Sequence, residues 1–221
     1  MENKKLLLKC LVGSRAHGLH TEDSDYDYRG VYVLPTQEIL SLSHKYKGSS
    51  WIEGNEDNTS YEIGHFLELA IKCNPSILEV FIAPPVEMYA NWGVRIKMLF
   101  DYVWNPKDAF NAFVGYGLNQ RKKMLDNNLG RWEKYAVAYL RTLLNLNNLL
   151  KTGTFSLEVT DSIWKRMLIK TKNKQYLVGS IIDKAQVLTE EAREYLEDCK
   201  HESDKEKVNS FLLEVRKEFW E

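Results

Sequence analysis

Two aspartates, Asp25 and Asp27, are separated by one residue and stand just before a strand-like run. Alternate side chains of an extended strand point to one face, so two such carboxylates lie close enough to share a hard cation. Two negative charges held that close repel each other unless a metal ion or a proton neutralises them. Mg²⁺ takes oxygen ligands and usually binds one or two carboxylates, with water and substrate phosphates as its other ligands.

A glycine and a serine, Gly13 and Ser14, stand eleven residues upstream of the aspartate pair, directly after the first strand-like run. A glycine there lets backbone amides approach a phosphate, and the serine hydroxyl adds a donor. By itself, an Asp-x-Asp pair is most often a solvated turn, and Gly-Ser is common turn chemistry. The ordered combination is more specific and describes a site for a triphosphate with magnesium.

Strands are expected on both sides of this motif, and helices dominate the rest of the chain. Apolar or alternating runs predict strands over residues 5–13 and 28–34, and a further strand that starts at 51–52 and resumes over 59–61. From Ile63 the apolar spacing becomes helical, and Asn74-Pro75 ends that helix. Residues 39–42 fit a helical turn or an extended piece equally well. Helices are predicted over residues 63–73, 76–82, 106–126, 133–151, 160–170, 180–198 and 203–219.

Composition sets broad limits on the protein class. The chain has 221 residues and 44% hydrophobic residues, which suits one large or two small domains and excludes disorder of the whole chain. Its three cysteines lie far apart, so neither a disulfide framework nor a cysteine zinc site is expected. With no apolar run long enough for a bilayer and no signal-peptide pattern, we expect a cytoplasmic protein without membrane contact.

The two halves of the chain differ in charge. Residues 1–105 carry ten basic and fourteen acidic residues, a net charge of −4, whereas residues 106–221 carry twenty and seventeen, a net charge of +3. The acidic half suits metal binding and the basic half suits a polyanion, although ordinary surface charge explains the asymmetry equally well. Aromatic residues of the second half, among them Trp132 and Trp164, could stack on a base, but at helical spacing such residues more often belong to the core.

The motif as a whole, GSRAHG followed by SDYD, resembles the signature of the DNA polymerase β nucleotidyltransferase superfamily. The stretches RGVY after the aspartates and NPSILEV at 74–80 are similar to the branch of predicted nucleotidyltransferases associated with RNA repair in bacteria and phages. The resemblance covers residues 10–85 and extends more faintly to 134–153. It implies an α+β fold: a small mixed β-sheet nucleotidyltransferase core with flanking helices over 1–105, then a C-terminal helical domain over 106–221 that closes the active-site cleft.

The resemblance also implies the reaction and its main residues. A nucleoside monophosphate moves from an NTP such as ATP to a hydroxyl, and pyrophosphate is released. Asp25 and Asp27 are implied to bind two Mg²⁺ ions, with Mn²⁺ as an alternative. Gly13 and Ser14 are implied to hold the phosphates. Arg15 and Ser24 are the nucleotide-binding candidates beside them.

A third carboxylate, on a neighbouring strand, is implied to act on the incoming hydroxyl and to join the metal ligands. Asp57 and Glu62 are the two candidates. We prefer Asp57, because Glu62 falls at a strand-to-helix junction, where a carboxylate that starts the helix is also expected.

One departure from the family pattern concerns the phosphate-binding cations. Many relatives have an Arg-Lys pair early in the helix after that strand, where this chain has Gly64-His65. The cation expected near the phosphates is then either missing or replaced by His65, with Lys134 and Arg141 of the helical half as further sources of positive charge. Exposed helix charge explains Lys134 and Arg141 equally well.

The expected acceptor is an RNA 3′ end, with tRNA among the candidates, because of the family's setting and the basic second half. Two alternatives stay open. One is a non-catalytic nucleotide-binding or regulatory module, which Gly64-His65 favours, and the other is a transferase that places AMP on a protein partner. The sequence leaves the acceptor, the preferred NTP and the oligomeric state undecided.

Overall fold

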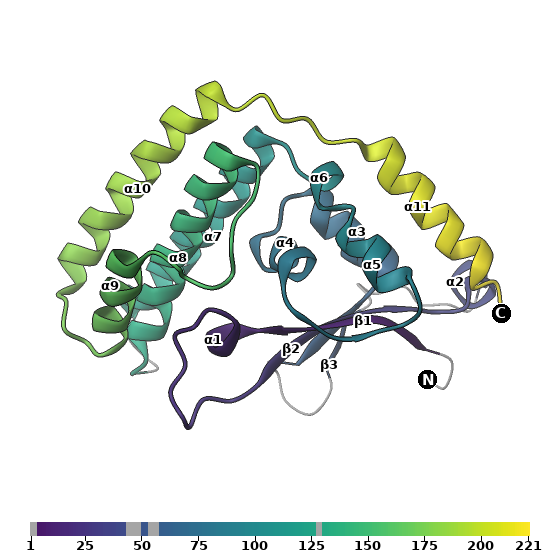
Figure 1. The fold of residues 1–221 in the computed structure, drawn as a ribbon, viewed down its shortest axis with the longest axis horizontal. Helices are drawn as coiled ribbons and strands as arrows, with labels where there is room; N and C mark the ends of the chain where they lie inside the picture. Colours follow the sequence, from purple (N-terminus) through teal and green to yellow (C-terminus); the bar gives the residue numbers. More distant parts are fainter. Residues whose placement is uncertain (1–3, 43–49, 53–57, 127–129) are drawn as a thin grey trace. The chain divides into compact units, whose positions relative to one another are not determined.

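The computed structural model describes residues 4–42, 50–52, 58–126 and 130–221 (Figure 1). The chain divides into two compact units. The first unit holds the sheet and takes Met1–Lys72, Ser76–Trp104 and Ser203–Glu221, and the second takes Cys73–Pro75 and Asn105–Glu202. The predicted α+β class is confirmed, since a small mixed sheet with flanking helices is accompanied by a helical region.

Within the described residues, five strands form one sheet in the order β3-β4-β2-β1-β5. Strand β2 runs parallel to β4, and the other neighbouring pairs are antiparallel. The central strands are the most buried, and Leu8, Cys10 and Val31 have no exposed surface. The strands are β1 (Lys5–Val12), β2 (Asp27–Val33), β3 (Ser50–Ile52), β4 (Thr59–Glu62) and β5 (Pro85–Met88).

Helices of the first unit lie over one side of this sheet (Figure 1). Phe81 lies between Phe66 and Phe100, with ring centroids 5.0 Å and 6.3 Å away. Burial of these aromatic side chains supplies a large part of the core of the first unit. The helices of this unit are α1 (Gly13–Ala16), α2 (Thr36–Leu40), α3 (Ile63–Ile71), α4 (Pro75–Ile82), α5 (Trp92–Lys97), α6 (Phe100–Val103) and α11 (Lys205–Glu218).

The second unit contains the four long helices predicted between residues 106 and 198. Helix α8 buries a wide apolar stripe, and it ends at Gly153, whose φ of +79° is the left-handed conformation that glycine adopts without strain. Asp161 caps the next helix, because its carboxylate accepts from the Ile163 and Trp164 amides at 2.8 and 2.9 Å. The helices are α7 (Pro106–Asp126), α8 (Trp132–Thr152), α9 (Ser162–Lys172) and α10 (Val178–Asp198). No helix in the described ranges has both the length and the apolar character to cross a bilayer.

Helix α11 packs on the sheet unit. The Trp92 ring lies 5.9 Å from the rings of both Phe211 and Phe219, measured between centroids. Arg216 donates to the two carboxylate oxygens of Glu62, at 2.6 and 2.9 Å. The family resemblance implies a helical domain over all of 106–221, whereas the structure groups 203–221 with the first unit. The physical reason is that α11 packs Phe211 against Trp92 of the sheet unit and pairs Arg216 with its Glu62.

Local structure also differs from the sequence prediction around residue 85. The sequence patterns predict no strand after residue 82, but Pro85 begins strand β5, which pairs with β1 at the sheet edge. A proline is tolerated at the first residue of an edge strand, because its missing N–H costs no ladder bond there. The short helices α5 and α6 were not predicted, and the undecided stretch at 39–42 contributes to α2.

The ion pair between Glu62 and Arg216 is expected to dominate the attachment of α11. Glu62 is 0% exposed, so Arg216→Met leaves a buried carboxylate without a counter-charge and should lower the free energy of unfolding by about 3–5 kcal/mol. The control is Glu214→Gln, which removes the more exposed Arg95–Glu214 pair and should cost about 0.2–1 kcal/mol. Urea unfolding followed by tryptophan fluorescence measures both. Equal losses in the two variants would contradict a special role for the buried pair.

Candidate functional site

The Gly-Ser turn and the aspartate pair meet at one end of the two central strands. Strand β1 ends at Val12 and Gly13 begins the single-turn helix α1. Strand β2 begins at Asp27, which pairs with Val12 in the antiparallel register. The chain thus leaves the sheet at Gly13 and returns to it at Asp27, directly beside its point of departure.

Gly13 and Asp27 are in direct contact. The glycine has a φ of +70°, and a Cβ at this position would lie 2.0 Å from Asp27 Oδ2. Since no real side-chain carbon approaches an oxygen that closely, only glycine leaves room for the carboxylate. The structure therefore places the carboxylate against the turn that the sequence analysis selected for phosphate.

Arg15 holds the loop that leads into the aspartate pair. Its Nε donates to the Ser24 carbonyl at 2.9 Å, and its Nη2 donates to the Glu22 carbonyl at 3.3 Å. The guanidinium carbon also lies 4.0 Å from the centre of the Tyr26 ring. These contacts bracket Asp25 on both sides, so the observed role of Arg15 is to position the loop. A contact with phosphate stays a prediction.

Ser24 also takes part in the geometry of this loop. Its Oγ accepts from the Thr21 amide at 2.9 Å and lies 3.1 Å from Thr21 Oγ1. Its own amide donates to the Thr21 carbonyl at 3.1 Å. These bonds form a closed turn before Asp25, and a direct role for Ser24 in nucleotide binding stays a prediction.

The two aspartates offer carboxylate oxygens that suit magnesium as ligands. Asp25 is exposed and Asp27 is half-buried. Both supply carboxylate oxygens, which are the ligands that Mg²⁺ prefers, so the residues present fit the ion. In the described ranges, no group of three or more His, Cys, Asp or Glu side chains is arranged to hold a metal.

Glu62 has a structural role in the first unit. Its Oε2 accepts from the Gly64 amide at 2.7 Å, and this caps helix α3. Both oxygens are also bound by Arg216. The geometry therefore supports the role of Glu62 as a helix-start carboxylate.

Asp57, the preferred third carboxylate, lies outside the described residues. Its neighbour Asn58 accepts a hydrogen bond from the Tyr28 amide through Oδ1, at 3.0 Å. This contact joins the approach to β4 to the first residues of β2, and Tyr28 directly follows Asp27.

The three predicted cationic residues lie on two helices. His65 is on α3, with its ring centroid 6.2 Å from that of Tyr61 and its Nδ1 3.8 Å from Glu68 Oε2. Lys134 is exposed and Arg141 is buried, and both are on α8 in the second unit. Their roles beside a triphosphate stay predictions.

The buried thiol of the first unit is not suited to nucleophilic chemistry. Burial raises the pKa of Cys10 to about 11, an effect that the nearby Lys97 ammonium opposes. Burial in turn lowers the pKa of Lys97, whose Nζ donates to the Ala83 carbonyl at 2.6 Å. Because the thiolate is the reactive form, we interpret Cys10 as a core residue.

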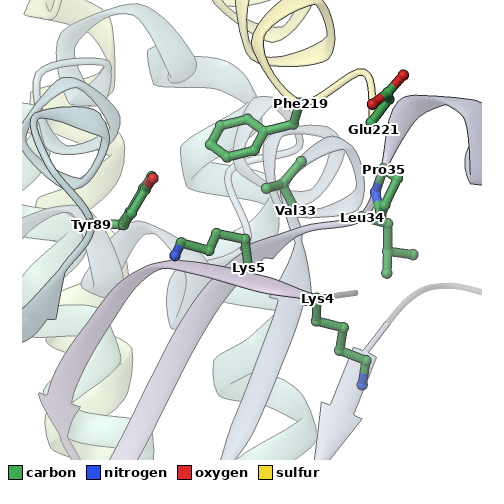
Figure 2. Close-up of a pocket in the computed structure, with 8 residues that line it drawn as sticks. All are labelled: Lys4, Lys5, Val33, Leu34, Pro35, Tyr89, Phe219 and Glu221. Atoms are coloured by element: carbon green, nitrogen blue, oxygen red, sulfur yellow. The ribbon is translucent and has the colours of Figure 1, made fainter. Parts of the chain in front are cut away.

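A pocket of about 470 Å³ lies at the opposite end of β1 from the motif (Figure 2). Lys5, the first residue of β1, lines it together with Val33 and Phe219. The Lys5 ammonium lies 4.0 Å from the centre of the Tyr89 ring. Since β1 ends at Val12 on the motif side, this pocket is separate from the candidate site.

The contact between Gly13 and Asp27 predicts an unequal cost for two glycine substitutions. Gly153→Ala should cost about 1–2 kcal/mol of unfolding free energy, because its φ is positive but a methyl group there meets nothing within 4 Å. Gly13→Ala should cost at least about 1 kcal/mol more, because its methyl group also overlaps Asp27. Chemical unfolding measures both, and Gly13→Ala/Asp27→Ala should recover the additional loss. Equal costs for the two glycines would refute the overlap.

The Arg15 contacts predict an ordered loop. In Arg15→Ala the backbone order parameters of residues 22–25 should fall from about 0.85 to below about 0.6, because both carbonyl bonds are lost. Arg15→Lys should restore them only in part, since an ammonium cannot span the two carbonyls as a guanidinium fork does. Amide ¹⁵N relaxation provides the measurement, with the exposed Arg193→Ala as control. An unchanged loop in Arg15→Ala would show that Arg15 is not its support.

Comparison with known proteins agrees with the motif. Residues 1–214 match RlaP, described as the RNA repair pathway DNA polymerase beta family. Over 89 residues the chain is 28% identical to an uncharacterized 38.9 kDa protein from the nrdC-mobD intergenic region of Enterobacteria phage T4. The match covers 37% of this chain and 26% of the phage protein, so it spans about a quarter of that relative. The resemblance inferred from the motif is confirmed, and the chain belongs to the RlaP family of DNA polymerase β-like proteins in RNA repair.

Proposed function

We propose that the protein is a magnesium-dependent nucleotidyltransferase that moves a nucleoside monophosphate from an NTP to the terminal hydroxyl of an RNA. The observation that carries the proposal is the contact of the Asp27 carboxylate with the Gly13 turn. This contact supports the proposal because the carboxylate proposed to bind metal lies against the turn proposed to bind phosphate. Membership of a polymerase β-like family of RNA repair supports the same reaction class.

In this proposal the chain's own residues bind and orient the triphosphate. We propose that the Gly13-Ser14 turn presents its backbone N–H groups to phosphate oxygens. The hydroxyl of Ser14 adds a donor. Asp25 and Asp27 would hold the magnesium ions, which when bound would neutralise the negative charge that develops during transfer. Arg15 acts indirectly, because it fixes the loop that presents Asp25.

The transfer is an in-line displacement at the α-phosphorus. The acceptor hydroxyl oxygen forms a bond to this phosphorus while the bond to the bridging oxygen of the β-phosphate breaks, and pyrophosphate leaves with the electron pair. The acceptor proton passes to a carboxylate, for which we propose Asp57. Glu62 is the weaker candidate, because Arg216 and the Gly64 amide already occupy its oxygens.

RNA is the proposed acceptor class, and a tRNA 3′ end is one member of it. The family description supports an RNA substrate, and the net charge of +3 on residues 106–221 suits a polyanion. We place the reaction in the cytoplasm.

Pyrophosphate release tests the proposal. Each of the four NTPs is offered with Mg²⁺ or Mn²⁺, with and without total tRNA, and pyrophosphate is quantified. Asp25→Asn and Asp27→Asn should each reduce release at least about a hundredfold, which corresponds to roughly 2.7 kcal/mol in the barrier. Asp23→Asn is the matched control, because this neighbouring exposed carboxylate has no assigned role and should leave the rate unchanged.

The fate of an α-³²P label separates the alternatives. Label on RNA that is lost in Asp25→Asn supports the proposal. Label on a protein would replace the RNA acceptor by a protein acceptor. NTP binding without pyrophosphate release, with or without RNA, would contradict catalysis and favour a nucleotide-binding module.

A further inference from the structure

Charge is distributed unevenly along the chain of the second unit. Residues 121–134 and 170–174 carry eight basic and two acidic residues, a net charge of +6. Residues 186–202 carry two basic and six acidic residues, a net charge of −4. The modest positive charge of the C-terminal half is therefore the sum of two regions of opposite sign.

The two basic segments meet at the start of helix α8. The Lys123 ammonium, near the end of α7, lies 5.8 Å from the centre of the Tyr135 ring in the first turn of α8. The Lys174 ammonium, which follows the end of α9, lies 3.5 Å from Glu133 Oε2 in the same turn. The end of α7, the start of α8 and the end of α9 thus lie together. We call this surface, formed by residues 121–126, 130–134 and 170–174, the basic end of the second unit.

The acidic segment lies at the opposite end of α8. The Lys151 ammonium, in the last turn of α8, is 5.4 Å from the centre of the Tyr195 ring, which belongs to the acidic part of α10. Helix α8 has 21 residues and is about 30 Å long at the usual rise per residue. Salt screens charges over about 8 Å at physiological ionic strength, so the acidic segment does not cancel the positive potential of the basic end.

Exposed cations outnumber carboxylates at the basic end. Glu133 forms an ion pair with Lys174, and Asp126 is the other carboxylate of the two basic segments. Residues 175–185, which lead into α10, add one aspartate and one lysine and leave the balance unchanged. The exposed cations are Lys122, Lys123, Arg131, Lys134, Lys170 and Lys174.

We propose that the basic end binds the phosphate backbone of an RNA strand. A strand carries one phosphate per nucleotide, so cations from three helices engage several of its charges at once, which a single small anion does not offer. Binding through the backbone is independent of sequence, as a surface of lysine and arginine side chains implies. The inference rests on the proposed function, because it names the surface that holds the RNA acceptor, and the family description favours RNA over an acidic protein.

The salt dependence of RNA binding tests the proposal on the whole chain. Fluorescence anisotropy measures the affinity for a labelled oligouridine of about twelve nucleotides, in EDTA and at about 50 to 200 mM KCl. Lys122→Gln/Lys170→Gln removes two exposed cations of the basic end. It should weaken binding at least about tenfold at the lowest salt. The slope of log K against log[KCl] should become less negative by about 1.4, since each phosphate contact of a single strand contributes about 0.7.

A matched pair of substitutions controls for net charge. Arg193→Gln/Lys200→Gln removes two exposed cations from the acidic segment and lowers the net charge of the protein by the same amount. It should change the slope by less than about 0.3. Lys134 stays unchanged in both variants because it is also a candidate for triphosphate binding. Far-UV circular dichroism checks that both variants fold.

Every outcome decides for or against the basic end. Selective loss in Lys122→Gln/Lys170→Gln supports it, whereas equal losses in both variants, or no RNA binding by the parent protein, overturn it. Polyglutamate that displaces the RNA at equal charge concentration also overturns it and favours an acidic protein as partner. The readout is binding in EDTA, so it does not depend on pyrophosphate release. RNA binding without release would contradict only the proposed transfer, and release without selective loss of binding would contradict only this surface.

Discussion

The contact between the Asp27 carboxylate and the Gly13 backbone is the constraint around which the candidate site is built. It requires glycine at position 13, and it ties the end of β1 to the start of β2 through the antiparallel register. The segment between these positions is consequently a loop with both ends fixed at one place. The Arg15 side chain donates to two carbonyls of this loop and holds it in place. The candidates for metal binding and for phosphate binding therefore form one local unit.

The sheet holds strand β2, which begins at Asp27, through pairing with its neighbouring strands. Strand β4 lies beside β2 in parallel and leads directly into α3, and Glu62 stands at that junction. Its carboxylate caps α3 and binds Arg216 of α11, so one buried group joins strand, helix and the C-terminal segment. A buried charge of this kind contributes more to a defined arrangement than to net stability, because desolvation offsets much of its Coulomb attraction.

Periodicity in the sequence was sufficient to predict most of the elements, but it could not show what each element packs against. The stripe of α8 and the runs of β1 and β2 follow simple patterns, and Gly13 with Asp27 was recognisable from residue type and order. The apolar face of α11 is just as regular, yet only the structure shows that Trp92 covers it. Arg15 is a phosphate-binding candidate through the family resemblance, whereas the two carbonyls that it binds have no signal in the sequence.

The pairing of Glu62 with Arg216 has a consequence for how the protein is made. The two residues are 154 positions apart, and the whole second unit lies between them in the chain. During synthesis the carboxylate therefore emerges from the ribosome long before its guanidinium, at the roughly 5–20 residues per second of translation. The sheet unit therefore lacks the counter-charge of Glu62 until the last helix is made, whereas the helical unit has all of its own sequence earlier. Long-range closure of this kind slows folding, so the motif acquires its final support only when almost the entire chain has been translated.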